Sequence, residues 1–464
     1  MEPWQMSAGE QAAAIAAGEL TSVEVVQAHI DRIAAVNDKL NAVTTVLDSA
    51  LADAAAADAA RVAGAGLGPL HGVPFTIKEN LDVAGSATTE GLVAYEQNVV
   101  DLDAPVVERM KAAGGVALAR TNLPDLGLRV HTDSGLRGLT RNPHHQDRTA
   151  GGSSGGEASA LSSGMSPIGL GNDIGGSLRN PAFCCGIASI KPGFGRVPSA
   201  AMTEPRSGTL VAQLMAVDGP MARTVADVRL GLEVLSGPHP RDPFSLPLAM
   251  RGPEVAKRVA LVPEPEGGAT DPGIAESVRR AGAALEAAGY EVEEIAPPSV
   301  AECARLWATW LGGETTILLP ILETVMSGDA LTFLENARSL WPEPDHVGAI
   351  TTLTERHVVA RAWSEFMAEW PIVVGPVWCQ PPFTHGFDVE SPDATAQVIE
   401  LLRYVTPFNL LGLPAAVVGA GQLPDGMPAA VQVGTDRGRE DLALDVAEVI
   451  EAAFGAPRPI DPRW

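Results

Sequence analysis

The spacing of apolar and polar positions along the chain predicts helices that alternate with short strands. Residues 21–24 read Thr-Ser-Val-Glu, in which Thr21 can cap a helix and Glu24 can bond back to it. Apolar Val25, Ile30 and Ile33 then recur beside polar positions, which is the pattern of an amphipathic helix. Further helices are predicted over the alanine-rich residues 49–64 and over residues 104–113 and 440–453.

Short apolar runs and strict alternation predict the strands. Phe75 and Ile77 alternate with Thr76 and Lys78, which indicates a short strand that ends at the lysine. Similar runs predict strands at residues 115–120, 372–374, 415–418 and 429–433. Strands that alternate with helices are typical of an α/β layered fold. The chain has no internal repeat and no linker long enough to divide it, although the prolines between residues 238 and 253 mark a surface crossing.

Composition places the chain among folded proteins and narrows its partners. Of 464 residues, 46% are hydrophobic and 19% are charged, as in a globular enzyme rather than a disordered chain. The net charge of −25 repels phosphate backbones and anionic lipids, so we expect neither a nucleic-acid partner nor a membrane partner. The chain contains no run of about 18 apolar residues, so we expect no membrane span. The acidic N-terminus lacks the basic start of a signal peptide.

The four cysteines indicate neither a metal site nor a disulfide framework. No two of Cys184, Cys185, Cys303 and Cys379 have the spacing of metal ligands. Cys184 and Cys185 adjoin apolar residues, so we expect both to be small buried side chains. With the absence of a signal peptide, this predicts a reduced, cytoplasmic protein.

The candidate chemistry lies in two clusters rich in glycine and serine. The first reads Gly151-Gly-Ser-Ser-Gly-Gly-Glu157, and the second reads Asn172-Asp-Ile-Gly-Gly-Ser-Leu-Arg179. Glycine costs backbone entropy, so such clusters indicate backbone that approaches another group closely or exposes N–H donors. A serine directly after Gly175 and Gly176 can lie on a sharp turn whose free N–H groups form an oxyanion hole. The residues alone leave open that these are two ordinary loops.

Several segments resemble the amidase signature family. They read Leu70-His-Gly-Val-Pro-Phe-Thr-Ile-Lys78-Glu-Asn-Leu-Asp82, Thr121-Asn-Leu-Pro-Asp125, the stretch from Arg148 to Arg196, Phe408-Asn-Leu-Leu-Gly-Leu-Pro414 and Gly426-Met-Pro-Ala-Ala-Val-Gln432. The spacing of Ser153 and Ser177 matches the two catalytic serines of the family, and Lys78 falls in its lysine motif. The similarity runs nearly from end to end and is weak only over residues 238–400.

The resemblance implies a relay in which Ser177 is the nucleophile, Ser153 the bridge and Lys78 the base. Lysine can act as a base only when it is neutral, and burial among apolar neighbours favours the neutral form. Strand alternation directs Glu79, which would hold the lysine charged, to the other face. Without the other motifs, a surface lysine would be the simpler interpretation of Lys78.

The resemblance also assigns roles around the two serines. It implies that the peptide bond before Ser153 is cis, with Gly152 easing the geometry, and that Ser154 is a neighbour rather than the bridge. The amides of Ile174, Gly175, Gly176 and Ser177 are expected to hold the carbonyl oxygen. Asp173 and Arg179 are expected to brace the loop by hydrogen bonds. No metal or other cofactor is expected, because neither a zinc motif nor a phosphate-binding loop occurs.

A Ser-His-Asp triad is the rival arrangement. The pattern Gly-x-Ser-x-Gly occurs twice, centred on Ser153 and Ser154, and His71, His144 and His145 are the nearby histidines. That arrangement needs a strand that leads into the serine, whereas residues 142–148 have the composition of a loop. His71 is expected to be a hydrogen-bonding loop residue instead.

The resemblance implies an α/β amidase signature fold with a large, mixed, twisted β-sheet covered by helices on both faces. We expect one domain over residues 1–464. Its parts would be a helical N-terminal part (1–65), a signature core (66–235), a variable substrate-pocket region (236–400) and a return to the core (401–464).

The expected function is hydrolysis of the C–N bond of non-peptide amides through an acyl-enzyme on Ser177. The range of the family implies aryl or hydrophobic small molecules and extends to esters and carbamates, with a monomer or homodimer as the assembly. Two alternatives remain: the glutamine-hydrolysing subunit of a tRNA-dependent amidotransferase, and a non-catalytic scaffold. The stretch Leu123-Pro-Asp-Leu-Gly127 is more similar to stand-alone amidases, and a scaffold would not need all three positions of the relay.

Substrate selectivity is expected from the loops at residues 128–140, 200–215 and 300–345. The last contains six large apolar residues, whose helical spacing fits a core position and leaves a pocket position open: Trp307, Trp310, Ile317, Leu318, Ile321 and Trp341. Arg206 is a candidate polar gate.

Overall fold

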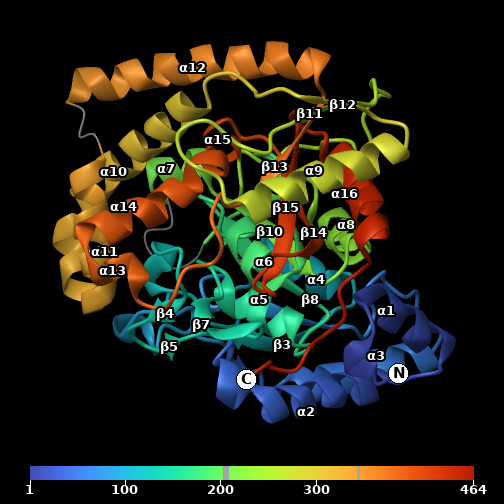
Figure 1. Ribbon diagram of the computed structural model, residues 1–464. Coiled ribbons are helices and arrows are strands. Elements are labelled where there is room, and N and C mark those ends of the chain that lie inside the picture. The colour runs from blue at the N-terminus through green and yellow to red at the C-terminus, as the bar shows by residue number, and fades with distance from the viewer. Residues whose placement is uncertain (202–207, 342–344) are drawn as a thin grey trace.

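One mixed β-sheet of eleven strands runs through the centre of the protein (Figure 1). The computed structural model describes residues 1–201, 208–341 and 345–464. The strands lie in the order β1 (Val43–Val46), β3 (Val116–Thr121), β2 (Pro74–Lys78), β8 (Ile168–Asp173), β10 (Val217–Ala222), β9 (Ala188–Lys191), β14 (Ala415–Gln422), β15 (Pro428–Thr435), β13 (Ile372–Pro376), β11 (Arg258–Leu261) and β12 (Glu291–Glu294). Strand β2 is parallel to both β3 and β8, and β11 is parallel to both β12 and β13, whereas the other pairs are antiparallel.

The central strands are apolar on both faces because helices cover the sheet on both sides. In β14, Ala415 and Val417 pack into one hydrophobic core, and Ala416 and Val418 pack into the other. This alternation follows from the two-residue period of a strand. The expected α/β fold, a large mixed sheet between two layers of helices, is confirmed.

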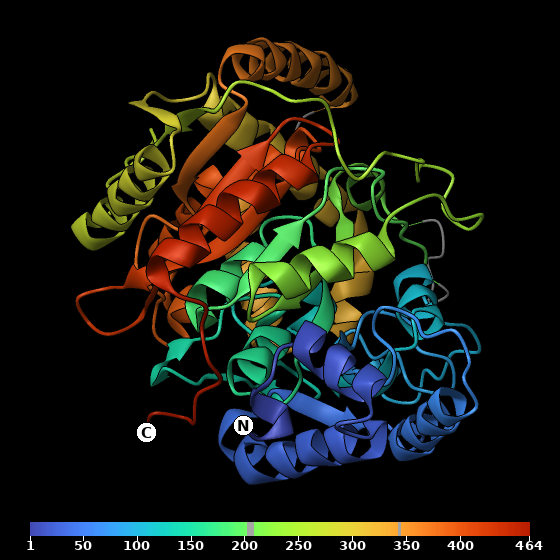
Figure 2. The ribbon, with the colours of Figure 1, turned by 90° about the vertical axis from the view of Figure 1, so that its right-hand side faces the viewer.

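The helices divide between the two faces and one edge of the sheet. Figure 2 shows α8 (Val225–Leu235), α9 (Pro272–Ala287) and α16 (Glu440–Phe454) across the face turned to the viewer, where they share a core with α4 (Pro105–Ala112). The opposite face is covered by α5 (Gly155–Ser162), α6 (Arg179–Cys185) and α10 (Val300–Val325). At the β1 edge lie α2 (Ser22–Leu40) and α3 (Ala50–Val62), with α1 (Ala8–Ala17) near α8.

Beyond α10, the chain adds a group of helices that forms the left and upper part of Figure 1. These are α11 (Gly328–Leu340), α12 (His346–Glu369), α13 (Phe387–Glu390) and α14 (Pro392–Glu400), followed by α15 (Thr406–Leu410), with α7 (Leu210–Met215) on the same side. In the part of the chain that the structure describes, no helix combines the length and apolar character needed to cross a bilayer.

Most predicted elements are confirmed, and one is wrong. Helix α2 begins with the expected capping box, in which the side chain of Thr21 accepts from Glu24 N. Residues 142–148 were expected to form a loop, but they belong to a hairpin of β6 (Arg141–Asn142) and β7 (His145–Thr149). The pattern missed this hairpin because the residues at the start of β7 are polar and exposed, so no apolar alternation marks them.

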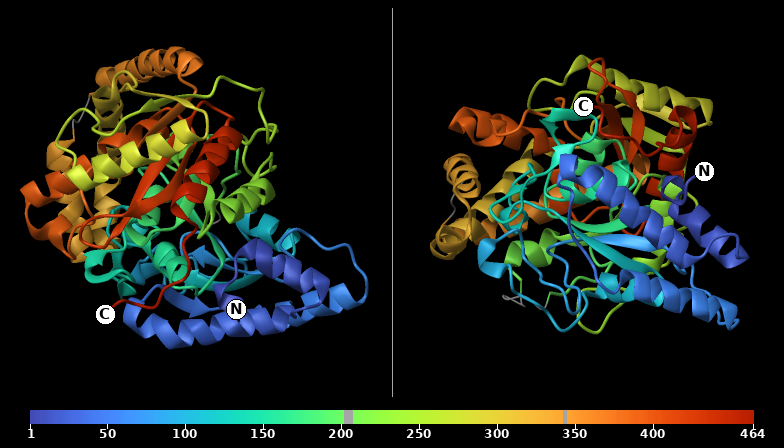
Figure 3. Two further views of the ribbon diagram at one scale, coloured as in Figure 1. Left: turned by 45° about the vertical axis from the view of Figure 1, so that its right-hand side comes forward. Right: turned by 90° about the horizontal axis from the view of Figure 1, so that it is seen from below.

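The C-terminal tail returns to the N-terminal helices, and the chain end lies beside α2 (Figure 3). Arg32 in α2 donates to Asp461 Oδ1 at 2.6 Å, and Ile460 N donates to the carbonyl of Ser162 at the end of α5. The tail therefore joins the first helices to one of the helices that carry the glycine-rich segments.

A buried ion pair holds the loop before β4 (Asp133–Ser134) against α13. Arg129 Nε and Nη2 donate to the two carboxylate oxygens of Asp388 at 2.8 and 3.0 Å, and neither side chain is open to solvent. Such a pair is costly to break, because the partner left behind is a buried charge without compensation.

We expect Asp388→Ala to lower the free energy of unfolding by roughly 3–5 kcal/mol, because it leaves the Arg129 guanidinium buried and unpaired. Urea denaturation of the parent and the variant measures the change. The matched control is the double variant Arg129→Met/Asp388→Leu, which removes both charges and should lose much less. A stability of Asp388→Ala close to that of the parent would contradict the assignment.

Candidate active site

Lys78 is the last residue of β2, and its side chain is fully buried. Strand alternation places Phe75 and Ile77 in the core on the other face of the sheet, so the surroundings of the amine are polar rather than apolar. Lys78 Nζ donates to Ser153 Oγ and to Asn172 Oδ1, both at 2.7 Å. The lysine thus joins the first glycine-rich segment to the neighbouring strand β8.

Burial lowers the pKa of Lys78 to about 7, although nearby carboxyl groups, led by Glu90, oppose the shift. Burial also raises the pKa of Glu90 to about 8. Glu79 does not form an ion pair with Lys78. Its carboxylate is instead bound by Arg137 at 3.0 Å and by the hydroxyls of Thr44 and Thr89. A lysine with a pKa near 7 is partly neutral at physiological pH and can accept a proton.

Ser153 lies in the turn between β7 and α5, after a cis Gly152–Ser153 peptide bond. A side chain at position 152 would clash, since a Cβ there would lie 2.5 Å from the carbonyl carbon of Val130. The hydroxyl of the neighbouring Ser154 is buried and has no hydrogen-bond partner among the residues described. Of these two serines, the lysine therefore contacts Ser153.

Ser177 lies on the turn between β8 and α6 and is 6% exposed. The three backbone carbonyls that precede Ser177 in this turn each accept a hydrogen bond. Trp307 Nε1 donates to Ile174 O at 2.8 Å, and Asn180 Nδ2 donates to Gly175 O at 3.2 Å. Gly176 O accepts from the backbone N–H groups of Arg179 and Asn180 at 2.8 and 2.6 Å. The orientation of three successive peptide planes is thereby fixed.

The N–H groups of the same turn divide into occupied and free donors. Gly176 N donates to Asp173 Oδ1 at 2.8 Å, so this amide is occupied, unlike the four free amides that the resemblance implied. Within residues 1–201, 208–341 and 345–464, the N–H groups of Ile174, Gly175 and Ser177 have no hydrogen-bond acceptor. Three amides of this turn are therefore free donors.

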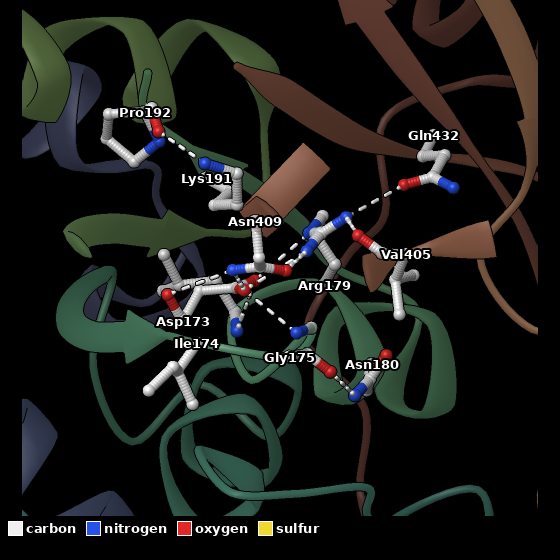
Figure 4. A network of polar contacts seen from close by, with 12 residues as sticks. Asp173, Ile174, Gly175, Arg179, Asn180, Lys191, Pro192, Val405, Asn409 and Gln432 are labelled. Carbon is white, nitrogen blue, oxygen red and sulfur yellow. Dashed lines mark hydrogen bonds and ion pairs between the residues drawn. The ribbon is translucent and has the colours of Figure 1, made fainter. Parts of the chain in front are cut away.

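Asp173 and Arg179 brace this turn from inside the core (Figure 4). Arg179 Nε and Nη2 donate to the two oxygens of Asp173 at 3.0 and 3.1 Å, and the same carboxylate accepts from Leu178 N. Burial favours the neutral acid, but the Arg179 guanidinium overcomes it and holds the pKa of Asp173 at about 2. Arg179 also donates to Val405 O, Asn409 Oδ1 and Gln432 Oε1.

Asn180 connects the two serine-bearing turns, which the sequence analysis did not foresee. Its Nδ2 lies 3.2 Å from Gly175 O and 3.4 Å from Gly152 O, while Trp378 Nε1 donates to its Oδ1 at 2.9 Å. The only signal in the sequence was the position of Asn180 directly after the glycine-rich segment. In the described part of the chain, the hydroxyls of Ser153 and Ser177 do not bond to each other.

The histidines near these segments have other partners, and the adjacent cysteines are buried. His71 Nε2 lies 3.0 Å from Ala57 O, as expected of a loop hydrogen-bonder, and His144 Nε2 lies 3.0 Å from Cys185 O. Among the residues described, no histidine bonds to the hydroxyl of Ser153, Ser154 or Ser177. Cys184 and Cys185 are buried, as predicted, and burial raises the pKa of both thiols.

The apolar residues at 307–341 divide between core and surface. Trp307 and Trp341 are buried and meet edge to face, with ring centroids 6.3 Å apart. Ile317 and Ile321 are 79% and 63% exposed, so they do not belong to the core. Arg206, the candidate polar gate, lies outside the described residues.

Comparison with known proteins identifies the family. The family model described as Amidase matches residues 24–444. An indoleacetamide hydrolase of Bradyrhizobium diazoefficiens is 41% identical and covers 97% of this chain and 87% of its own length. An acylamidase of Rhodococcus erythropolis is 32% identical over 98% of this chain and 96% of its own length. The solved structure of 6-aminohexanoate cyclic dimer hydrolase complexed with substrate superposes with a TM-score of 0.86 at 27% identity, over 100% of this chain and 99% of that one.

The match of the family model, the end-to-end identity and the shared fold agree with the segments around Lys78, Ser153 and Ser177 on which the resemblance rests. The chain therefore belongs to the amidase signature family of amide hydrolases.

Proposed function

We propose that the protein hydrolyses small amides through an acyl-enzyme on Ser177, with Ser153 as proton bridge and Lys78 as base. The observation that carries this proposal is the buried Lys78 amine, which lies 2.7 Å from Ser153 Oγ. Supporting observations are the lowered pKa of Lys78 and the Asn180 amide that links the turns of the two serines.

The proposed reaction begins when Ser177 Oγ attacks the amide carbon. Its proton passes to Ser153, whose own proton passes to the neutral Lys78, while the carbonyl electrons become an oxyanion. The proton then returns along the same path to the amide nitrogen as the C–N bond breaks, which leaves an ester on Ser177. Water repeats the sequence at this ester and releases the carboxylic acid. No external oxidant, reductant or metal is needed to balance these steps.

The oxyanion is proposed to lie against the free N–H groups of Ile174, Gly175 and Ser177. Donors that are held in place before the reaction stabilise the developing charge without reorganisation. The hydrogen bonds to the carbonyls of this turn supply that fixation. Gly176 takes a supporting role through its bond to Asp173.

The proposed substrates are amides with an aryl or other hydrophobic acyl group, such as an arylacetamide. The 41% identity to an indoleacetamide hydrolase supports this class. Esters and aryl carbamates of the same acyl group are proposed as side substrates, because they present the same carbonyl to Ser177. Glutamine should be assayed beside these substrates. If the protein hydrolyses glutamine faster than the arylacetamide, its function is more like that of the glutamine-hydrolysing amidotransferase subunit.

Ser177→Ala should lower turnover of an arylacetamide by several orders of magnitude, since it removes the proposed nucleophile. A sulfonyl fluoride should label Ser177, and mass spectrometry of the digested protein locates the label. Ser154→Ala is the matched control and should retain most of the activity, because the Ser154 hydroxyl contacts neither the lysine nor another described donor or acceptor. Exclusive labelling of a different serine would refute the assignment.

The pH–rate profile should show a rise through about pH 7, because only neutral Lys78 accepts the proton and burial brings its pKa to about 7. Asn172→Asp should move this rise to higher pH, since it replaces the neutral acceptor of the Lys78 amine with a carboxylate, which favours the ammonium form. Initial rates of both proteins across pH measure the shift. A rise that stays in place in Asn172→Asp and persists in Lys78→Ala would mean that another group is the base.

Ser153→Ala should slow amide cleavage more than cleavage of the matched ester, with the aryl carbamate in between. The physical reason is that an amide nitrogen leaves only after protonation, whereas an alkoxide or phenoxide leaves more readily. Ratios of variant to parent rate for the three substrates are the measurement. Equal ratios would show that Ser153 activates the nucleophile alone.

A further inference from the structure

Trp307 brings α10 into direct contact with the turn that carries Ser177. Its side chain is 4% exposed, and its Nε1 donates to Ile174 O at 2.8 Å. The ring also covers the next residue, because a Cβ on Gly175 would lie 2.6 Å from Trp307 Cζ2. On the other side, Trp341 packs edge-on against the ring. The indole is therefore held by a hydrogen bond to Ile174, by packing against Gly175 and by the ring of Trp341.

The hydrogen bond determines where the Gly175 N–H points. In a trans peptide the C=O of Ile174 and the N–H of Gly175 point in opposite directions. Because the carbonyl is directed at Trp307, the Gly175 N–H is directed away from the indole, and it has no acceptor among the residues described. A hydrogen bond to the carbonyl also polarises the peptide unit and strengthens its N–H as a donor.

Several of the other contacts that hold this turn come from nearby in the sequence, and Asn409 adds one from the last part of the chain. Asp173 precedes the turn, and Arg179 and Asn180 begin α6. Trp307 lies 133 residues further along the chain, in the region where the resemblance to the family is weak. The contact thus joins the variable helices to the backbone amides of the reaction site.

We propose that Trp307 is a positioning residue for the oxyanion hole: its indole N–H holds the Ile174–Gly175 peptide so that the Gly175 N–H meets the oxyanion. This inference rests on the proposed acyl-enzyme mechanism. Trp307 acts through the peptide rather than on the substrate, so it should influence the transition state more than ground-state binding.

The first test is Trp307→Phe, which keeps an aromatic ring and removes the N–H. We expect kcat for an arylacetamide to fall roughly 10-fold, less than the roughly 10²–10³-fold loss on removing a direct oxyanion donor. KM should change little. The Ki of a trifluoromethyl ketone with the same acyl group, which forms a tetrahedral oxyanion adduct, should rise by the same factor as kcat/KM falls.

Trp310→Phe is the matched control on the same helix. Trp310 Nε1 also donates a hydrogen bond of 2.8 Å, but its acceptor is Thr352 Oγ1 in α12 rather than the turn at Ser177. Its kcat and Ki should stay close to those of the parent. An equal loss in both variants would show that disturbance of α10 explains the effect, and the proposal would fall.

A second variant separates the hydrogen bond from packing. Benzothienylalanine at position 307 replaces the N–H with sulfur and preserves the ring shape, so it also decides the matter if Trp307→Phe does not fold. It should show the same loss of kcat and of inhibitor affinity with an unchanged melting temperature. Parent-like values would overturn the proposal and leave packing as the role of Trp307.

Ser177→Ala, measured in the same series, shows whether the acyl-enzyme mechanism or only the role of Trp307 has failed. If Ser177→Ala remains active, the proposed acyl-enzyme mechanism fails. If Ser177→Ala is inactive while both replacements at position 307 match the parent in kcat and Ki, only the role of Trp307 fails.

Discussion

The turn that carries Ser177 depends on one buried ion pair, Asp173–Arg179. Each oxygen of the Asp173 carboxylate accepts a hydrogen bond from one backbone N–H of the turn and from one guanidinium N–H of Arg179. These contacts compensate the negative charge and also hold the backbone of the turn. Burying two charges is costly unless their remaining donors and acceptors are satisfied. Arg179 meets this condition through Val405, Asn409 and Gln432, which belong to the last part of the chain. The return of the C-terminal strands to the core is thereby tied to the geometry around Ser177.

Two adjacent residues of β8 then create opposite electrostatic conditions. Asp173 is a charged acceptor and keeps its partner Arg179 paired within the core. Asn172 is a neutral acceptor and bonds to Lys78 on the other side. A carboxylate in place of Asn172 would stabilise the ammonium form of Lys78 and raise its pKa. The neutral amide holds the amine in place and favours its charge much less than a carboxylate would, so burial brings the pKa of Lys78 to about 7.

The sequence predicted the regular elements and the family better than it predicted the details of the site. Helix α2, strand β2 and the late strands follow from periodicity and capping, which are local signals. The assignment of Lys78, Ser153 and Ser177 came from the resemblance, because the spacing of three polar residues does not reveal which of them meet. The hairpin β6–β7 was missed because its residues carry no apolar alternation.

The occupied Gly176 amide and the link through Asn180 were beyond prediction for a different reason. Both depend on the direction of individual peptide planes, which tertiary contacts set and residue identity does not encode locally. The number of free donors in a glycine-rich turn therefore cannot be counted from its glycines.

Two contacts that join the helices after residue 300 to the turn at Ser177 and to Asp125 have a common character. Trp307 binds a backbone carbonyl of the turn, and the backbone N–H of Ser327 donates to Asp125 at 2.6 Å. In each contact one partner is main chain, which is present whatever side chain occupies that position. Only Trp307 and Asp125 contribute side chains to these two contacts, so the other side chains of α10 and α11 can change without removing either contact. These two contacts therefore constrain few of the side chains over residues 300–341.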